Sequence, residues 1–454
     1  MKQGLRMLNK LNSQTIYFYT SVFMILLIAF ISLPFGTGDT AELVLSSQRM
    51  RECLNSGIFF SCTEMERFGL SPHLISIVLL SIFNDINSAI TAWSLLNFLL
   101  FMYLIYKLNA DYADRKYFLI GTIVFSPLTA YAVYSYTEMS FIVLSFILLM
   151  NIKNERYWLS LLLGMFLSGY KESAILIVLP LTLAVILSNK NKLILKDYLL
   201  IASPVVGFSS VSLFNYFKYG EFINSGYQSA ERVKELNLQI SNFLGIWLSP
   251  SGGIIGFFWI SIILLLFINL KSILKINKYR KSLYLILFTI AINALLLTNW
   301  YAPYGWVTWG PRLFMPVVVL GLLSTIIIRG GTVISNSKSL HITHLLFSYL
   351  SSSALIGFLI NSDAFRFWLT NVIFKADVCP RLFDWGTERE PYINCFLNMS
   401  WNLNSLPFLT IKNYFNFLYQ ISNLINLYTL PVLIFTLSFI LYFVKSITNH
   451  DNQK

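Results

Sequence analysis

The chain has 454 residues, of which 56% are hydrophobic and only 12% are charged, and its mean hydropathy is +0.65. A soluble domain carries about 25% charged residues, so this composition excludes a soluble globular fold. The net charge of +12 would suit a nucleic-acid-binding protein. However, the basic residues lie between apolar runs, as they do in membrane proteins that follow the positive-inside rule.

The apolar runs predict an all-α polytopic membrane protein with roughly twelve transmembrane helices. Lipid offers no hydrogen bonds to the backbone, so spanning segments must be helices or a closed barrel, and continuous rather than alternating runs favour helices. The run 73–83 is too short to cross and is expected to be a re-entrant or interfacial helix. The expected spans are 15–34, 87–107, 117–135, 138–152, 157–170, 172–188, 198–216, 254–270, 283–299, 313–328, 342–361 and 427–445.

The charges indicate which side of the membrane each loop occupies. With the N-terminus in the cytoplasm and the first span retained rather than cleaved as a signal peptide, most Lys and Arg residues fall on the cytoplasmic side. The strongest of these inner loops is "KSILKINKYRKS" (271–282). Both termini are then cytoplasmic, and we expect a multi-pass protein of the bacterial inner membrane. Three substantial segments, 35–86, 217–253 and 362–426, lie outside.

The cysteines fit this orientation. Cys53 and Cys62 share the first outer loop, and Cys379 and Cys395 share the last. All four are expected on the oxidising side, where two local disulfides would form. The alternative is four unrelated thiols.

Carboxylates stand close to the outer ends of several spans. Asp39 and Glu42 follow the first span in "LPFGTGDTAELV", and Glu138 lies in "YAVYSYTEMSF" between two spans. Partial burial at the membrane surface can bring the pKa of a carboxylate towards the working pH of a general base. The alternative for Asp39 and Glu42 is that acidic residues merely mark a span end. In "GYKESAI", Lys171 and Glu172 are functional candidates or a snorkelling pair.

Cations and aromatic residues gather on the same side. Lys218 and Tyr227 lie in "NYFKYGEFINSGYQ", and Trp306, Trp309 and Arg312 lie in "WYAPYGWVTWGPRLFMP". Some of these rings belong to an interfacial belt, whereas a guanidinium at that height can bind a phosphate through two hydrogen bonds. Carboxylates, cations and rings together would suit a lipid-linked phosphosugar.

These stretches, in this order, resemble the GT-C superfamily of glycosyltransferases, multi-span enzymes that use polyprenyl-phosphate sugars. "SYTEMSF" is similar to the group's "TE-x-x-F" element, "GMFLSGYKESAILIVLP" to its "G-(x)-G-(x)-K" helical pair, and "NYFKYGEFINSGY" to its "N-x-x-(R/K)-(Y/F)-G" element. "WLSPSGGIIGF" resembles its "L-x-S-P-x-x-G" element and "GWVTWGPRLFMP" its "GW-x-WGPR" run. The chain departs from the group in the first outer loop, where the usual "PPLYP" stretch is reduced to "LSPHLISIVLL".

The resemblance implies a GT-C-like bundle capped by outer loops and the transfer of a hexose from a polyprenyl-phosphate donor, with inversion, to an extracytoplasmic glycan or lipid-linked acceptor. Asp39 fits the group's catalytic base best and Glu42 second, while Glu138 would orient the acceptor or a cation. Roles for the remaining residues follow from the same resemblance. They are phosphate binding by Arg312, Lys171 and Lys218, and sugar or acceptor binding by Trp306, Trp309 and Tyr227.

The resemblance also divides the chain. Residues 1–361 would form the catalytic transmembrane region with the first outer loop 35–86, residues 362–426 would select the acceptor, and 427–454 would hold the last span and a cytoplasmic tail. Size and loop plan also resemble bactoprenol-linked glucosyltransferases that modify the O-antigen of lipopolysaccharide. We expect no tightly bound metal, because the histidines show no ligand spacing, although Asp39 and Glu138 leave use of a divalent cation open.

Three other classes fit a multi-span chain. A lipid-linked oligosaccharide polymerase or ligase would rely on outer-loop arginines and a catalytic histidine. A flippase or transporter would place charged or broken helices near the bilayer midplane. A non-catalytic membrane scaffold would use the aromatic run only as a belt.

Overall fold

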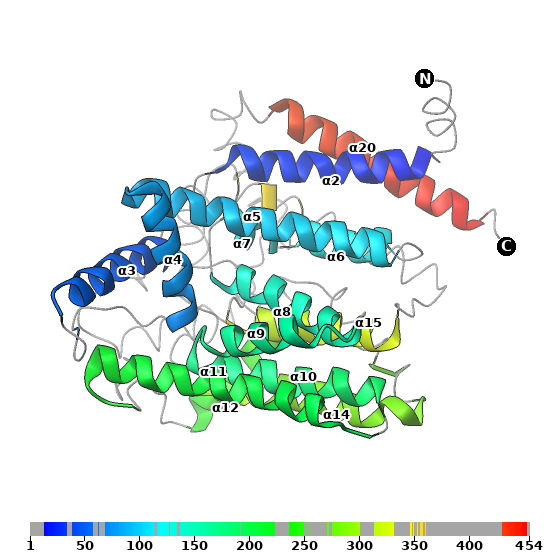
Figure 1. Ribbon diagram of the computed structural model, residues 1–454. Helices are drawn as coiled ribbons and strands as arrows, with labels where there is room; N and C mark the ends of the chain where they lie inside the picture. Colours follow the sequence, from blue (N-terminus) through cyan, green and yellow to red (C-terminus); the bar gives the residue numbers. More distant parts are fainter. Residues whose placement is uncertain are drawn as a thin grey trace.

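The structure, a computed structural model, is built of helices wherever it describes regular elements (Figure 1). It describes residues 13–33, 39–57, 62, 69–112, 116–126, 128–133, 137–190, 192–222, 236–248, 254, 270–271, 275–299, 313–330, 429–451 and six single positions between 346 and 359. The elements in chain order are α2 (Ser13–Ile31), α3 (Asp39–Asn55), α4 (Leu70–Phe83), α5 (Ile86–Asp111), α6 (Lys116–Val124), α7 (Leu128–Val133), α8 (Thr137–Lys153), α9 (Tyr157–Ser168), the 3-10 helix η2 (Glu172–Ala174), α10 (Ile175–Asn189), α11 (Leu195–Tyr219), α12 (Leu236–Leu248), the 3-10 helix η5 (Asn277–Tyr279), α14 (Arg280–Thr298), α15 (Met315–Arg329) and α20 (Thr429–Asp451).

Five helical segments in the described part of the chain are long and apolar enough to cross a membrane: Ser13–Ile31, Ile86–Asp111, Glu172–Asn189, Leu195–Tyr219 and Asn277–Thr298. Each coincides with an expected span. Four further expected spans correspond to α8, α9, α15 and α20, and shorter apolar helical segments lie in the last three of these.

The expected span at 117–135 differs from the structure, which has two short helices, α6 and α7, in its place. The sequence has Pro127 between them, and a proline disfavours helical backbone at the residue before it. The expected spans at 254–270 and 342–361 lie mostly outside the described residues. The structure therefore supports a multi-span helical protein without fixing the number of spans at twelve.

One end of the bundle, which we call the inner end, is joined by polar side chains. Lys153 donates from Nζ to Asn189 Oδ1 at 2.9 Å, which links the ends of α8 and α10. Lys190 donates to Tyr157 Oη at 2.7 Å and to Asp197 Oδ1 at 2.8 Å, which joins α9, α10 and α11. The cytoplasmic ends of these helices, as the charge pattern predicts them, thus lie together.

The first and last described helices meet at the same end. Gln14 of α2 donates to Ser446 Oγ of α20 at 2.8 Å. In Figure 1, α2 begins and α20 ends on the right-hand side of the bundle, while α3 and α4 lie at the left-hand end. This arrangement is the one expected if both termini lie on one side of the membrane.

The opposite end, which we call the outer end, is built around close backbone contacts. Gly69 N donates to Tyr170 O and Ser71 N donates to Gly169 O, both at 3.1 Å. A Cβ at Gly69 would lie 2.3 Å from Gly169 O, so only glycine allows this approach. These bonds fix the start of α4 against the turn between α9 and η2.

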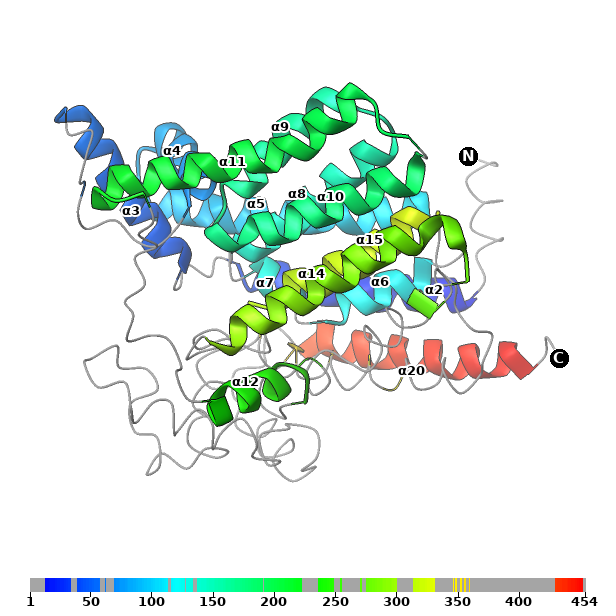
Figure 2. The same ribbon diagram turned by 90° about the horizontal axis from the view of Figure 1, so that it is seen from below.

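Helices α9 and α11 run side by side in the same direction. Their backbones approach closely because small residues lie at the contact. A Cβ at Gly207 would lie 2.0 Å from Met165 O, and one at Gly164 would lie 2.3 Å from Ser203 Oγ. Figure 2 shows α11, α10 and α14 side by side, with α12 beyond the outer end of α14. There Asn242 donates to Thr298 O at 3.0 Å.

The centre of the bundle is formed by helices that are apolar all round. Every residue of α15 from Met315 to Ile328 is buried, and α8 is buried along most of its length. A helix without a polar face must be enclosed by other helices or by lipid. By contrast, α2, α5, α11 and α14 each expose large apolar side chains, Phe23, Leu99, Leu213 and Leu295 among them, which we assign to the lipid side.

Candidate active site at the outer end of the bundle

An ion pair between a buried glutamate and a half-buried lysine marks the outer end. Glu138 lies in the first turn of α8 and is only 4% exposed, and Lys171, just before η2, places its Nζ 4.0 Å from Glu138 Oε1. A buried carboxylate needs a nearby positive charge to offset the cost of leaving water. The helix N-terminus adds to this stabilisation because the first turn carries partial positive charge. The sequence places both residues beside the membrane, and the structure brings them together.

A second polar contact lies next to this pair in the chain. Asn215 of α11 donates from Nδ2 to Glu172 Oε1 over a long 3.5 Å, linking η2 to the last two turns of α11. The last turn of the same helix carries Lys218. The two lysines assigned to phosphate binding therefore lie just before η2 and in the last turn of α11, and η2 and α11 are in contact.

Lys218 itself is deeply buried, with 1% of its side chain exposed. Its Nζ lies 4.9 Å from the ring centroids of both Phe214 and Tyr219. The faces of these rings attract a cation and partly replace its hydration. Such a caged ammonium group keeps its position, as a binding site for an anion requires.

His73 of α4 packs into the same region, and the sequence did not predict a role for it. It is fully buried, and its ring meets that of Phe214 edge-to-face at 5.3 Å. Its Nδ1 lies 2.7 Å from Ser47 Oγ of α3. His73 thus connects α3, α4 and α11. The stretch "LSPHLIS" does not indicate this contact, because a single histidine within an apolar helix forms no motif and has no second ligand at a helical spacing.

Ser47 ties His73 to α3, and burial sets the protonation of its ring. Ser47 Oγ lies 2.7 Å from Leu43 O and 2.7 Å from His73 Nδ1, so one hydroxyl group bonds both the α3 backbone and the ring. Burial, and next the charge of Lys218, lower the pKa of His73 from 6.5 to about 3. The ring is therefore neutral at physiological pH.

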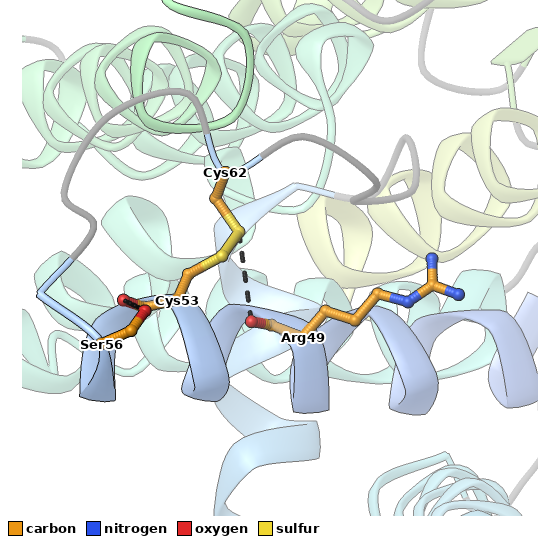
Figure 3. The surroundings of a disulfide bond; sticks show 4 residues. All are labelled: Arg49, Cys53, Ser56 and Cys62. Atoms are coloured by element: carbon orange, nitrogen blue, oxygen red, sulfur yellow. Dashed lines mark hydrogen bonds between the residues drawn. A yellow bond between two sulfur atoms is a disulfide. The ribbon is translucent and has the colours of Figure 1, made fainter.

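A disulfide fastens α3 to the end of α11. Cys53 and Cys62, the pair expected in the first outer loop, are joined, and Cys62 N donates to Phe217 O at 3.0 Å. Cys62 is buried against Met50 and Phe214. Figure 3 shows the bridge above α3, with the carbonyl of Arg49 facing the sulfur of Cys62 and the guanidinium of Arg49 directed away from it.

The two candidate bases of the first outer loop, Asp39 and Glu42, belong to α3. Asp39 is the first residue of the helix, and Glu42 is exposed one turn later. Between them and beyond, Thr40, Leu43 and Val44 are buried and hold this end of α3 against its neighbours. The backbone of Asp39 is therefore part of the helix that Ser47 and the disulfide fix; its side chain lies outside what the structure describes.

Several predicted site residues lie outside the described residues: Arg312, Trp306, Trp309, Tyr227, Cys379 and Cys395. The chain is described again from Leu313, directly after Arg312. Its next residue, Phe314, meets Trp247 of α12 edge-to-face at 5.1 Å. The start of α15 is therefore packed on α12, which Asn242 places beside the outer end of α14.

In the described part of the chain, no three His, Cys, Asp or Glu side chains gather as metal ligands. Use of a divalent cation stays a prediction, because the Asp39 side chain is not described. The arrangement that is described offers a buried carboxylate, two lysines from different elements and a rigid helix that carries further acids.

No protein-family model and no curated protein sequence matches the chain. Among solved structures, the chain is similar to ArnT from Cupriavidus metallidurans in the apo state, with 15% sequence identity and a TM-score of 0.47. It is also similar to ArnT from the same organism bound to undecaprenyl phosphate, with 14% identity and a TM-score of 0.45. In both cases the similarity covers 85% of this chain and 75% of the other.

Proposed function

We propose that this chain is a polytopic membrane glycosyltransferase of the GT-C kind, which moves a hexose from a polyprenyl-phosphate donor to an extracytoplasmic glycan or lipid-linked acceptor. The observation that carries the proposal is the ion pair of buried Glu138 with half-buried Lys171 at the outer end, with Lys218 caged on the neighbouring helix. Buried charges at a membrane boundary are costly and mark functional sites. The motif order in the sequence supplies the reaction class.

In the proposed reaction, the acceptor hydroxyl oxygen attacks the anomeric carbon of the sugar from the side opposite the phosphate. Asp39 takes the hydroxyl proton as general base, with Glu42 as the second candidate. The bond between the anomeric carbon and the phosphate oxygen breaks, and polyprenyl phosphate leaves with the electron pair. One displacement inverts the anomeric configuration.

The lysines would supply the electrostatic part of catalysis. Negative charge grows on the phosphate as it leaves, and Lys171 and Lys218, together with Arg312, would offset it. Glu138 would hold Lys171 in place and orient the acceptor. Trp306, Trp309 and Tyr227 would stack against sugar rings. O-antigen of lipopolysaccharide is the acceptor class that the size and loop plan favour.

The positions of the buried charges count against a flippase or transporter. Among the described residues, the buried side chains with a full charge are Glu138, Asp197 and Lys218, and each lies in the first or last turn of a helix. A transport pathway needs such groups near the midplane. For a polymerase or ligase with a catalytic histidine, His73 is unsuited because it is enclosed between α3, α4 and α11.

The proposal predicts that Glu138→Gln abolishes transfer. Because Lys171 loses its ionic partner and the acceptor loses a contact, we expect at least about a 100-fold fall in turnover. The measurement is transfer of labelled glucose from polyprenyl-phosphate glucose to a surface polysaccharide in membranes, normalised to folded protein.

Asp111→Asn is the matched control, because Asp111 also pairs with a lysine, Lys107, but on the half-exposed end of α5. It should keep near-normal turnover. If wild-type membranes transferred no sugar from any polyprenyl-phosphate donor, the proposed function would be wrong. If the Glu138→Gln variant stayed active, Glu138 would not be part of the active site.

A further inference from the structure

A cluster of basic side chains surrounds one tyrosine at the inner end of the bundle, far from the proposed active site. The ring centroid of Tyr157, the first residue of α9, lies 5.1 Å from Lys190 Nζ and 5.3 Å from Lys196 Nζ. Helix α11 begins beside it at Leu195. We call the group formed by Arg156, Tyr157, Lys190, Lys192 and Lys196 the inner basic cluster.

The charge of one lysine in the inner basic cluster, Lys190, is already balanced by an aspartate. Burial acts to lower the pKa of Lys190, but its hydrogen bonds to Asp197 and Tyr157 outweigh burial and raise that pKa. Lys190 is therefore charged and committed to Asp197 at 2.8 Å. Asp197 also accepts from Ile194 N at 2.9 Å and so closes the start of α11. This pair gives the cluster a fixed shape without using its other charges.

The remaining charges face outward. Arg156, Lys192 and Lys196 are exposed, and the exposed acid beside them is Glu155. Counting the Lys190–Asp197 pair as zero, three positive charges and one negative charge leave a net charge of +2. The N-terminus of α9 adds partial positive charge, because its N-cap residue Arg156 provides no side-chain cap.

The surface directly beside these cations is apolar and exposed. Trp158 is 82% exposed and Leu195 is 75% exposed, and each follows or precedes a cluster residue in the chain. Leu162 and Leu199 continue the same exposed faces one turn further into the bundle. An exposed tryptophan next to lysines is typical of the level where lipid headgroups meet acyl chains.

We propose that the inner basic cluster binds an anionic phospholipid of the cytoplasmic leaflet. The phosphodiester would contact Lys192, Lys196 and the first amides of α9, and the acyl chains would lie along Trp158, Leu162 and Leu195. A soluble phosphate would use the cations but not the apolar face, which is why a phospholipid fits the whole surface. Basic pockets between helices on the cytoplasmic side are suited to such headgroups. The proposal is independent of the proposed glycosyl transfer.

The test measures phosphatidylglycerol bound to the full-length protein by native mass spectrometry after purification in detergent. Wild-type protein should retain phosphatidylglycerol in preference to phosphatidylcholine. The double variant Lys192→Gln/Lys196→Gln should bind it about 30-fold more weakly, because both lysines that would contact the headgroup are lost.

Lys275→Gln/Lys281→Gln is the matched control, because these lysines are exposed on the same side and the charge change is equal. It should keep phosphatidylglycerol affinity within about twofold of wild type. Equal losses in both double variants would overturn the proposal, since general charge would then explain binding.

Two further measurements distinguish a phospholipid headgroup from free phosphate as the ligand of the cluster. Inorganic phosphate at millimolar concentration should not displace the lipid, and Trp158→Ser should weaken lipid binding while both lysines remain. Full displacement by inorganic phosphate, or unchanged lipid binding in Trp158→Ser, would overturn the assignment of a phospholipid. Thermal unfolding of each variant without added lipid shows that the protein is folded.

Discussion

His73 shows how a single buried side chain can organise the outer end. Its Nδ1 shares a hydrogen bond with Ser47 of α3, its ring packs on Phe214 of α11, and the charge of Lys218 lies close enough to lower its pKa. A protonated ring would place a second positive charge beside Lys218 in a site closed to water. The neutral form is therefore part of the folded state.

This chemistry predicts that the folded state loses stability in mild acid. The unfolded chain binds a proton at His73 near pH 6.5, whereas the folded chain does so only near pH 3. Stability from this group is complete above pH 6.5 and is lost as the pH falls towards 3, by about 1.4 kcal/mol per pH unit. Unfolding in detergent at pH 7.5 and pH 5 should show a loss of roughly 2 kcal/mol.

The variant His73→Asn should remove this pH dependence, because the amide offers Ser47 both a donor and an acceptor but does not titrate. His450→Asn, in the last turn of α20, is the control and should leave the wild-type slope intact. If His73→Asn and wild type lost stability equally between the two pH values, His73 would not be the group responsible.

In the proposed mechanism, Asp39 is the general base that takes the proton of the acceptor hydroxyl. Asp39→Asn removes the base without changing size, so turnover should fall roughly 10²–10⁴-fold. Glu42→Gln, one turn later on the exposed side of α3, should retain most activity. The assay is single-turnover transfer with saturating donor. A reversal of the two results would make Glu42 the base, and full activity in both variants would place the base elsewhere.

At the scale of elements, close backbone contacts decide which helices pack together, as burial of apolar side chains does for helices in water. Lipid is as apolar as leucine, so helices associate through tight packing and small residues. Helices α9 and α11 meet in this way at Gly164 and Gly207, and the start of α4 meets the turn after α9 at Gly69. These contacts place η2, with Lys171 before it, beside the end of α11.

Gly207→Ala should therefore destabilise the protein. The added Cβ would lie 2.0 Å from the backbone oxygen of Met165, which cannot move aside as a flexible side chain would. We expect a loss of about 1–3 kcal/mol, the usual cost of overpacking, measured as a lower midpoint of thermal unfolding in detergent. Ser209→Ala, on the exposed side of the same helix, should change the midpoint little. An unchanged midpoint in Gly207→Ala would show that α9 and α11 leave room for a Cβ between Gly207 and Met165.

The sequence predicted element positions well where hydrophobic runs were long. The spans at 87–107 and 172–188 coincide with α5 and with η2 and α10. It missed the break between α6 and α7, because the run 117–135 is apolar on both sides of Pro127. Apolar length is a local property that the bilayer selects directly, whereas a break in a helix depends on what its neighbours can satisfy.

At the scale of the whole molecule, polar contacts separate into two ends. Lys153, Tyr157 and Asn189 are joined at the inner end, and Glu138 and Lys171 are joined at the outer end. The disulfide belongs to the outer end, where Cys62 bonds the end of α11. An oxidising outer compartment agrees with this placement.

The two ends should be accessible from opposite sides of the membrane. We expect a membrane-impermeant maleimide to label Glu42→Cys in intact spheroplasts, and Lys192→Cys only after the membrane is opened. Both positions are exposed in the structure, so burial would not explain a failure to react. Labelling of both variants from the same side would contradict the topology and would remove Asp39 from the outer face.

The sequence by itself determined that the chain is a multi-span helical protein and where its long apolar helices run, because hydropathy acts on each segment independently of the others. Which loops share a side of the membrane stays a prediction from the charge pattern. The sequence also placed Cys53 and Cys62 in one outer loop. Only the tertiary structure decided that Lys171 reaches Glu138, that His73 joins Ser47 to Phe214, and that α9 and α11 begin together at a basic cluster. Helices that are apolar on every side give no signal of which faces will meet, so their partners are set by close packing of side chains and backbones from distant parts of the chain.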